Sequence, residues 1–534
     1  MPRTRLMTPL CLTLVLTASG CANLDREAPT GDSASAPELS PGEVQAVVPV
    51  PSNELEDAPP EAVAEDDIWA RLRAGFQFPE QSHERIDQER GRFTGQQNYF
   101  DAIGQRARPY LYHIVSELEA RNLPTDLLLV AVVESAFQPF AYSHGQAAGL
   151  WQFVPATGKQ FGLEQNWWYD GRRDVIASTD AALTYLEYLH DFFDGDWLLA
   201  LAAYNAGEGR VQRAVRANER AGEPTDFWHL SLPAETRAYV PRVLALRDIF
   251  AEPDRFGIRL PSIENERYLA IVELDNQLDL ALAADMADVD VEKIYHYNPG
   301  FNRWATLPDG AHQLAIPKRS KADFKSALAE LDPSEMVRWQ RHEVQRGDTL
   351  SGIASQYSTS TSVLRETNDL TGDNIRAGQA LLVPTASEDS EAYALSADNR
   401  RAANQSRERN GREKQEHQVQ SGDTFWDLAR RHGVGVQELA RWNDMAPGDP
   451  LRPGDRLVIW TEGSGGDQNG GPGERMQQVS YTVRSGDSVY TIARQFNVST
   501  QDVKRWNNIQ PGQYLQPGDS LTLEVDVTNQ SAGI

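Results

Sequence analysis

The sequence predicts an α+β protein of several domains, in which an all-α domain (residues 68–260) precedes three small β-α-α-β modules. Two observations predict it: apolar residues recur every three or four positions in the first half, and one pattern repeats three times in the last third. The length of 534 residues agrees, because it exceeds what one ordinary domain holds. Residues 261–335 lie between these parts and are either a fourth, degenerate module or an unrelated α+β connector.

Composition excludes several classes of protein. The chain carries 51 basic and 77 acidic residues, a formal charge of −26, so it would repel nucleic acid and an anionic bilayer surface. Its two cysteines, Cys11 and Cys21, both lie at the extreme N-terminus, which excludes a disulfide framework and a cysteine-based zinc site in the body of the protein.

Residues 1–20 have the features of a secretory signal. A basic start precedes the apolar run at 10–16, and the small residues at 18–20 come directly before Cys21. This arrangement resembles the lipobox of bacterial lipoproteins, which implies that Cys21 is acylated and becomes the mature N-terminus. Ala22 follows, which is similar to outer-membrane lipoproteins, so we expect a periplasm-facing protein held to the membrane by its acyl chains only. The alternative is a plain secretory signal with an incidental cysteine.

Residues 21–67 are rich in Pro, Ala, Ser and acidic residues and predict a disordered tether. Helical periodicity begins near Ile68 and is clear in the run from Phe100 to Leu118. Pro124 then opens an apolar helix that reaches Glu134. Strand-like alternation is absent from this part of the sequence, so it predicts helices only.

The repeats share one internal spacing. Each begins with a Gly-Asp turn, has an Asn 21 residues after that Gly, and has a second Gly before its last strand. The turns are Gly347-Asp348-Thr349, Gly422-Asp423-Thr424 and Gly486-Asp487-Ser488. They resemble the lysin-motif (LysM) domain at residues 341–385, 416–461 and 478–525, which implies that these turns bind N-acetylglucosamine-containing glycans. The linkers at 385–415 and 461–477 have compositions that predict flexibility.

A fourth copy is visible in outline. Gln277-Leu278-Asp279-Leu280 precedes Asn298 by the same 21 residues, but the Gly-Asp pair is missing. We therefore expect either a degenerate module packed on the helical domain or an unrelated connector.

Glu134 is the candidate catalytic residue, because it interrupts an apolar helix. Carboxylates are seldom buried without a purpose, and apolar surroundings raise a carboxyl pKa toward neutrality, as a general acid requires. The alternatives are a glutamate that points to solvent, or one paired with Arg172 or Arg173.

Three motifs follow Glu134-Ser135 in order: Gly149-Leu150-Trp151-Gln152-Phe153, Ala203-Tyr204-Asn205-Ala206-Gly207 and Glu235-Thr236-Arg237-Ala238-Tyr239. Together they resemble the soluble-lytic-transglycosylase family of lysozyme-like enzymes over residues 110–240. The resemblance implies a lysozyme-like fold, peptidoglycan as substrate and Glu134 as the single acid/base. It also implies a set of substrate-binding residues: Ser135, Trp151, Gln152, Tyr204, Asn205 and Tyr239. Trp151 and Tyr204 have core packing as an alternative role, and Asn205 has helix capping.

The mechanism follows from the missing second carboxylate. Ordinary glycosidases use two carboxyl groups, whereas no second acid sits beside Glu134 in these motifs. Glu235 is interpreted as a helix cap, and Asp170 and Asp174 as an ion-pair and helix-cap cluster beside the arginines. We therefore expect the substrate's own 6-hydroxyl to act as nucleophile and close a 1,6-anhydro ring, without cofactor or metal. The alternatives are a goose-type-lysozyme-like hydrolase that uses water, and a non-catalytic scaffold that binds the cell wall.

Overall fold

The computed structural model describes residues 66–526 with short gaps. The gaps are residues 309–311, 358, 410, 453, 463–475, 484–486, 497, 499, 511–514 and 517. The signal sequence, Cys21, most of the tether and Gly486 therefore lie outside the described residues. Among the described residues, no helix is both long enough and apolar enough to cross a membrane.

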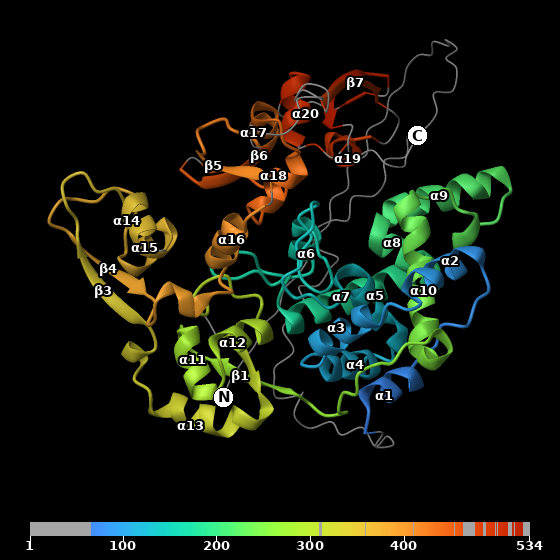
Figure 1. Ribbon diagram of the computed structural model, residues 1–534, viewed down its shortest axis with the longest axis horizontal. Coiled ribbons are helices and arrows are strands. Elements are labelled where there is room, and N and C mark those ends of the chain that lie inside the picture. The colour runs from blue at the N-terminus through green and yellow to red at the C-terminus, as the bar shows by residue number, and fades with distance from the viewer. Residues whose placement is uncertain are drawn as a thin grey trace, which may run out of the picture. The chain divides into compact units, whose positions relative to one another are not determined.

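The first domain is helical, as predicted (Figure 1). Its helices are α1 (Ile68–Ala74), α2 (Glu84–Phe93), α3 (Gln97–Ala107), α4 (Leu111–Ala120), α5 (Leu128–Ser135), α6 (Pro155–Gln160), α7 (Val175–Phe192), α8 (Trp197–Ala206), α9 (Glu208–Ala221) and α10 (Ala234–Ala251), with short 3₁₀ turns at Thr125–Leu127, Phe227–His229 and Pro253–Phe256. Residues 68–260 contain no strand, only isolated bridges.

Helix α5 lies in the middle of this domain because almost every side chain on it is apolar. Residues 128–131 are fully buried, and α10 packs against α5 as well as against α2 and α8. A helix that is apolar on all sides must be surrounded by other helices. This burial holds the polar C-terminal end of α5, Glu134-Ser135, at a fixed place in the fold.

Four β-α-α-β units follow, and each contains one two-stranded antiparallel sheet. The first is β1 (Leu269–Leu274), α11 (Leu280–Ala287), α12 (Val291–Tyr297) and β2 (His312–Pro317), followed by a 3₁₀ turn (Lys318–Ser320), α13 (Lys321–Glu330) and a second 3₁₀ turn (Pro333–Glu335). The second is β3 (Arg338–Glu343), α14 (Leu350–Gln356), α15 (Thr361–Thr367) and β4 (Ala380–Thr385). The third is β5 (Arg412–Gln418), α17 (Phe425–His432), α18 (Val436–Trp442) and β6 (Arg456–Glu462), and the fourth is β7 (Met476–Thr482), α19 (Val489–Gln495), α20 (Thr500–Trp506) and β8 (Ser520–Asp526). The α+β architecture predicted from the repeats is therefore confirmed.

The same asparagine fastens the second helix to the last strand in all four units. Its Nδ2 donates to two backbone carbonyls at 2.7–2.9 Å, and its Oδ1 accepts the N–H of a strand residue at 2.7 Å. The residues are Asn298, Asn368, Asn443 and Asn507. Residues 269–317 therefore share the internal bonding of the three clear repeats, although their Gly-Asp turn is missing.

The degenerate module is joined directly to the helical domain. The Asp170 N–H donates to the Gly300 carbonyl at 2.8 Å, and the Asn302 N–H donates to the Trp168 carbonyl at 2.7 Å. A Cβ at Gly300 would lie 2.6 Å from the ring of Tyr169, so only glycine allows this approach. These contacts fix one side of the 164–174 loop.

The linker after the first clear repeat is ordered at residues 386–406, contrary to the flexibility that its composition predicts. It carries a 3₁₀ turn (Ser390–Tyr393) and helix α16 (Ala397–Ser406). Tyr393 is buried, and its hydroxyl donates to the carboxylate of Asp279 at 2.8 and 3.0 Å. This buried aromatic residue, which composition alone does not reveal, helps to dock the polar segment.

Candidate active site

Glu134 lies at the last turn of α5, immediately before an irregular turn. Ala136 and Phe137 both have positive φ, at 48° and 57°, which side chains other than glycine adopt only where the surroundings enforce it. Phe137 is fully buried and anchors this turn in the core. The strained turn directs the chain away from the helix and leaves the Glu134 carboxyl half-buried at the helix end.

Within the described ranges, the carboxyl of Glu134 has one hydrogen-bond partner, the hydroxyl of Tyr239 on α10. Tyr239 Oη donates to Glu134 Oε1 at 2.7 Å. Desolvation raises the pKa of Glu134 to about 7; the nearby Glu235 charge acts in the same direction, while the Tyr239 hydrogen bond and Arg242 oppose it. A carboxyl with this pKa holds a proton at neutral pH and can also release it, which suits a general acid that later acts as base.

Tyr204 and Asn205 lie at the end of α8. The Tyr204 hydroxyl donates to the Trp151 carbonyl at 2.9 Å, and the Glu134 charge contributes to raising the Tyr204 pKa, so the two side chains lie near each other. Asn205 Oδ1 accepts a hydrogen bond from Thr236 Oγ1 at 2.8 Å, which ties α8 to the start of α10. Both residues remain half-buried and so keep part of their surface open.

Trp151 does not face solvent, and the prediction that it contacts substrate is wrong. Its side chain is fully buried, and its Nε1 donates to Thr179 Oγ1 of α7 at 3.0 Å. The indole therefore packs in the core of the helical domain. Its contribution to the site is its backbone carbonyl, which holds the Tyr204 hydroxyl.

The side chains of Ser135 and Gln152 both donate hydrogen bonds to nearby backbone carbonyls. The Ser135 hydroxyl donates to the Ala131 carbonyl one turn earlier at 3.2 Å. The Gln152 side-chain amide donates to the Gly149 carbonyl at 2.9 Å. Gln152 is half-buried with φ of 51°, so its side chain belongs to a tightly braced loop.

The loop that carries Gln152 is packed against an arginine pair. A Cβ at Gly149 would lie 2.0 Å from the Arg172 carbonyl oxygen, which explains the glycine in this motif. Arg172 forms a two-point ion pair with Asp170, with Nε–Oδ1 and Nη2–Oδ2 distances of 2.9 and 2.8 Å. Asp174 caps α7 by accepting the Ala177 N–H at 2.8 Å. The structural interpretation of these aspartates is confirmed, and Arg172 is paired with Asp170, not with Glu134.

Two contributors to the site received no role from the sequence: Thr236, which belongs to the third motif, and Arg242, which lies outside it. They lie three residues before and three residues after Tyr239 on α10, so all three share one face of that helix. This spacing of three residues is the sequence feature that could have indicated that Thr236 and Arg242 lie beside Tyr239. No group of three His, Cys, Asp or Glu side chains in the described part of the chain is placed to hold a metal ion.

In the repeats, the predicted glycan-binding turns use several side chains internally. Asp348 and Asp423 each accept a backbone N–H three residues earlier, at 2.7 and 2.8 Å, and each bonds a histidine of the preceding strand. Thr349 and Thr424 accept helix N–H groups at 3.0 and 3.1 Å. Asp487 accepts the Tyr481 hydroxyl, and Ser488 accepts the Thr491 N–H at 3.1 Å.

Gly347 and Gly422 provide the positive φ that these turns need, at 102° and 94°. Gly486, the corresponding residue of the last repeat, lies outside the described residues.

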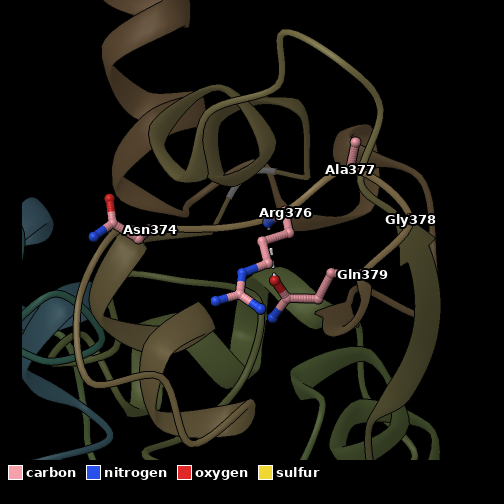
Figure 2. Close-up of a pocket in the computed structure, with 5 residues that line it drawn as sticks. All are labelled: Asn374, Arg376, Ala377, Gly378 and Gln379. Atoms are coloured by element: carbon pink, nitrogen blue, oxygen red, sulfur yellow. Dashed lines mark hydrogen bonds between the residues drawn. The ribbon is translucent and has the colours of Figure 1, made fainter.

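The segment before the second glycine of the first clear repeat is hollowed. An open pocket of about 550 Å³ is lined by residues 374 and 376–379 (Figure 2). The Arg376 N–H donates to Gln379 Oε1 at 3.0 Å, which closes the turn (Figure 2). This is the segment where the lysin-motif resemblance leads us to expect glycan contact.

Three family models match the chain. The "Transglycosylase SLT domain" matches residues 112–227, the "Lytic transglycosylase MltD, LysM-like domain" matches 268–333, and the "LysM domain" matches 342–384, 417–460 and 481–524.

The chain is 36% identical over 406 residues to the "Membrane-bound lytic murein transglycosylase D" of Escherichia coli (strain K12), which covers 74% of this chain and 86% of that protein. It is 44% identical over 170 residues to a "Putative tributyltin chloride resistance protein" of Alteromonas sp. (strain M-1), covering 32% of this chain and 80% of that one. Among solved structures, the lytic transglycosylase Slt of Pseudomonas aeruginosa matches with 28% identity and a TM-score of 0.21, covering 27% of this chain and 24% of that one.

A helical domain that matches the transglycosylase SLT model, followed by lysin-motif modules, defines a lytic transglycosylase that binds peptidoglycan. Similarity to the E. coli protein extends over most of both chains. The chain belongs to the family of membrane-bound lytic murein transglycosylase D.

Proposed function

We propose that Glu134 is the single acid/base of this transglycosylase. It protonates the glycosidic oxygen between N-acetylmuramic acid and N-acetylglucosamine, so that the C1–O bond breaks and the leaving sugar departs as an alcohol. The resulting carboxylate then takes the proton of the muramoyl 6-hydroxyl, whose oxygen bonds to C1 and closes the 1,6-anhydro ring. Glu134 ends in its starting protonated form, and no water is consumed.

The observation that carries this proposal is the state of the Glu134 carboxyl. Its pKa is raised to about 7 by burial, so both protonation states are within reach at neutral pH. Tyr239 orients the carboxyl and stabilises its charged form after the first proton has left. Tyr204, Asn205, Gln152 and Ser135 are proposed to position the sugars around it.

The water-using alternative would need a second carboxylate to activate the water. The carboxylate whose charge raises the pKa of Glu134 is Glu235, which is exposed in the first turn of α10. An acidic residue in the first turn stabilises a helix through the helix dipole, so Glu235 has a structural role that requires no part in catalysis. We therefore favour attack by the substrate's own hydroxyl over hydrolysis.

The test is mass spectrometry of the fragments that the purified protein releases from sacculi. Anhydromuramoyl ends are expected, and reducing muramic acid ends in their place would overturn the proposal in favour of a hydrolase. Release of no fragments by the wild-type chain, with wall binding intact, would favour the non-catalytic scaffold.

We further propose that the protein is lipid-anchored at Cys21 and faces the periplasm from the outer membrane. The support is the lipobox-like sequence before Cys21 and the alanine after it. Acyl chains would hold the enzyme at the membrane, while the repeats hold it on the glycan and raise the local concentration of substrate. Cys21→Ser should move the protein from the membrane fraction to the soluble periplasm, and persistence in washed membranes would contradict the anchor.

A further inference from the structure

Four arginines from three parts of the chain gather beside the loop that leaves the catalytic helix. Arg173 follows the 164–172 loop of the helical domain, Arg303 lies in the degenerate module, and Arg400 and Arg401 lie on α16. Asn302 joins these parts, because its side chain accepts from Arg173 at 3.3 Å and its carbonyl accepts the Ala397 N–H at 2.8 Å.

The positive charges outnumber the carboxylates that could neutralise them. Asp170 is already committed to Arg172 and lies 4.0 Å from Arg173. Arg303 is paired with Asp398, whose side chain is 60% exposed. Within the described part of the chain, neither Arg400 nor Arg401 has a carboxylate oxygen within 4.0 Å; Asp444 acts on Arg400 only from a distance.

Several donors in the cluster are buried without an acceptor. The Nε atoms of Arg173, Arg303 and Arg401 have no hydrogen-bond partner among the described residues. Arg400 donates to one carbonyl, that of Leu395, although a guanidinium has five N–H groups. A buried donor without a partner is costly, and a buried cation without a counter-ion more so, so an anion bound here would be stabilised.

Aromatic rings of the helical domain lie against three of these guanidiniums. Arg400 lies over Phe140 with 4.7 Å to the ring centroid, Arg173 over Tyr142 at 5.5 Å, and Arg303 over Trp167 at 4.2 Å. Burial, together with the neighbouring Arg173 and Arg303 charges, lowers the pKa of Arg400 to about 10. The cluster therefore holds buried guanidinium donors and an excess of positive charge.

We propose that this arginine cluster, built from Arg173, Arg303, Arg400 and Arg401, binds a carboxylate of the peptide stems that the glycan strand carries. The inference rests on the proposed function, since it takes peptidoglycan as the ligand. Guanidiniums bind carboxylates through two parallel hydrogen bonds, which would satisfy the orphaned donors and the excess charge together. Arg400 lies over Phe140, which belongs to the loop that leaves the catalytic helix, so the stem carboxylate would be recognised along that loop.

The test measures binding in the full chain that carries Glu134→Gln, so that no ligand is consumed. Calorimetry would compare a disaccharide with its tetrapeptide stem against the same disaccharide without the stem. Adding Arg400→Gln should weaken binding of the stem-bearing ligand roughly tenfold to a hundredfold and leave the stem-free ligand unchanged. Arg255→Gln, at an exposed ion pair with Glu252, is the matched control and should change neither.

Two further readouts decide the outcome. Because Arg400 lacks a carboxylate partner, its replacement should keep or raise the melting temperature; a clear fall, with both ligands weakened alike, would assign it a structural role and overturn the proposal. Arg401→Gln supplies a second variant should Arg400→Gln not fold. If inorganic phosphate displaces the stem-bearing ligand as well as the stem peptide does, the cluster is a phosphate site, and the carboxylate proposal is overturned. Cleavage of sacculi by the Glu134→Gln chain would overturn the catalytic assignment. The binding comparison would still hold, because a disaccharide with N-acetylmuramic acid at its reducing end does not contain the bond that the enzyme cleaves.

Discussion

Tyr239 Oη lies 2.7 Å from Oε1 of Glu134, and the two residues are 105 positions apart in the chain. The bond connects α10 to the end of α5, and among the described residues it is the one hydrogen bond to the proposed catalytic carboxyl. Because the hydroxyl donates, it favours the charged form of Glu134 and opposes the effect of burial on the pKa.

Tyr239→Phe should therefore raise the pKa of Glu134 further above its ordinary value. A general acid works while it is protonated, so wild-type activity should fall as the pH rises through about 7, and this alkaline limb should move to higher pH in the variant. At pH 6 the rate should stay within about tenfold of wild type, since one positioning hydrogen bond is lost. The measurement is the pH profile of kcat/KM on soluble glycan chains.

Tyr204→Phe is the matched control, because its hydroxyl bonds the Trp151 carbonyl and not the carboxyl. Its alkaline limb should stay at the wild-type pH. A limb that moves equally in both variants would mean that the Tyr239 bond does not tune Glu134.

Glu134→Gln should abolish glycan cleavage and at the same time stabilise the fold above neutral pH. The folded carboxyl has a pKa of about 7 against 4.5 for the free group, so the folded state binds more protons than the unfolded state between these values. Unfolding free energy therefore falls as the pH rises through this window in the wild type, and the amide removes that loss. The gain should be about 1 kcal/mol at pH 8, allowing for the partial exposure of the side chain, or a few degrees in Tm, and absent at pH 4.

Calorimetric melting of both chains at pH 4 and pH 8 gives this difference. A variant less stable than wild type at pH 8 would contradict the desolvation of Glu134, and residual cleavage within tenfold of wild type would contradict its catalytic role.

Much of this site could be read from the sequence, and what was missed has a physical reason. Glu134 was visible because a carboxyl interrupts an apolar run, and the repeats were visible because each carries an Asn at one spacing. Trp151 was misassigned because an aromatic residue in a loop motif gives no sign of whether it faces solvent or the core; its full burial against Thr179 is a property of tertiary packing.

The linker at 386–406 was misjudged for a related reason. Its average composition is polar, but its Tyr393 hydroxyl and Ser387 N–H both donate to the buried carboxylate of Asp279, more than 100 positions earlier. Composition averages over a segment, whereas docking depends on a few residues and their distant partner. The sequence likewise could not show that Arg303 and Arg400 lie close enough for the charge of one to affect the pKa of the other.

Glu235→Gln tests whether the enzyme uses one carboxyl group or two. Glu235 is exposed and acts on Glu134 only by raising its pKa, so its neutral isostere should keep kcat within about threefold of wild type. The alkaline limb should move slightly to lower pH, because a repelling charge has been removed. A loss of hundredfold or more would indicate a second catalytic carboxylate and would favour the hydrolytic alternative.

Ending the chain after Ser406 should separate wall binding from catalysis. This truncation removes the last two lysin motifs but keeps Tyr393 and α16. The hydrogen bond between Tyr393 and the buried Asp279 is therefore kept. Sacculus binding should weaken more than tenfold, since two of three repeats are lost, while turnover of short soluble glycans should stay within about threefold. Pull-down on insoluble peptidoglycan and turnover of a soluble muropeptide chain measure the two effects.

A second truncation, after Glu335, should behave differently, because it also removes Tyr393. Asp279 is 1% exposed and would lose the Tyr393 hydroxyl and the Ser387 N–H, so the degenerate module should lose about 3 kcal/mol of stability. Tyr393→Phe in the full chain is the control that removes the hydroxyl but keeps the ring, and it should cost about a third to a half of that amount.

The first truncation decides the separation of binding from catalysis. If the chain ending at Ser406 loses turnover as fully as it loses wall binding, the last two repeats contribute to the active site itself, and this separation is wrong.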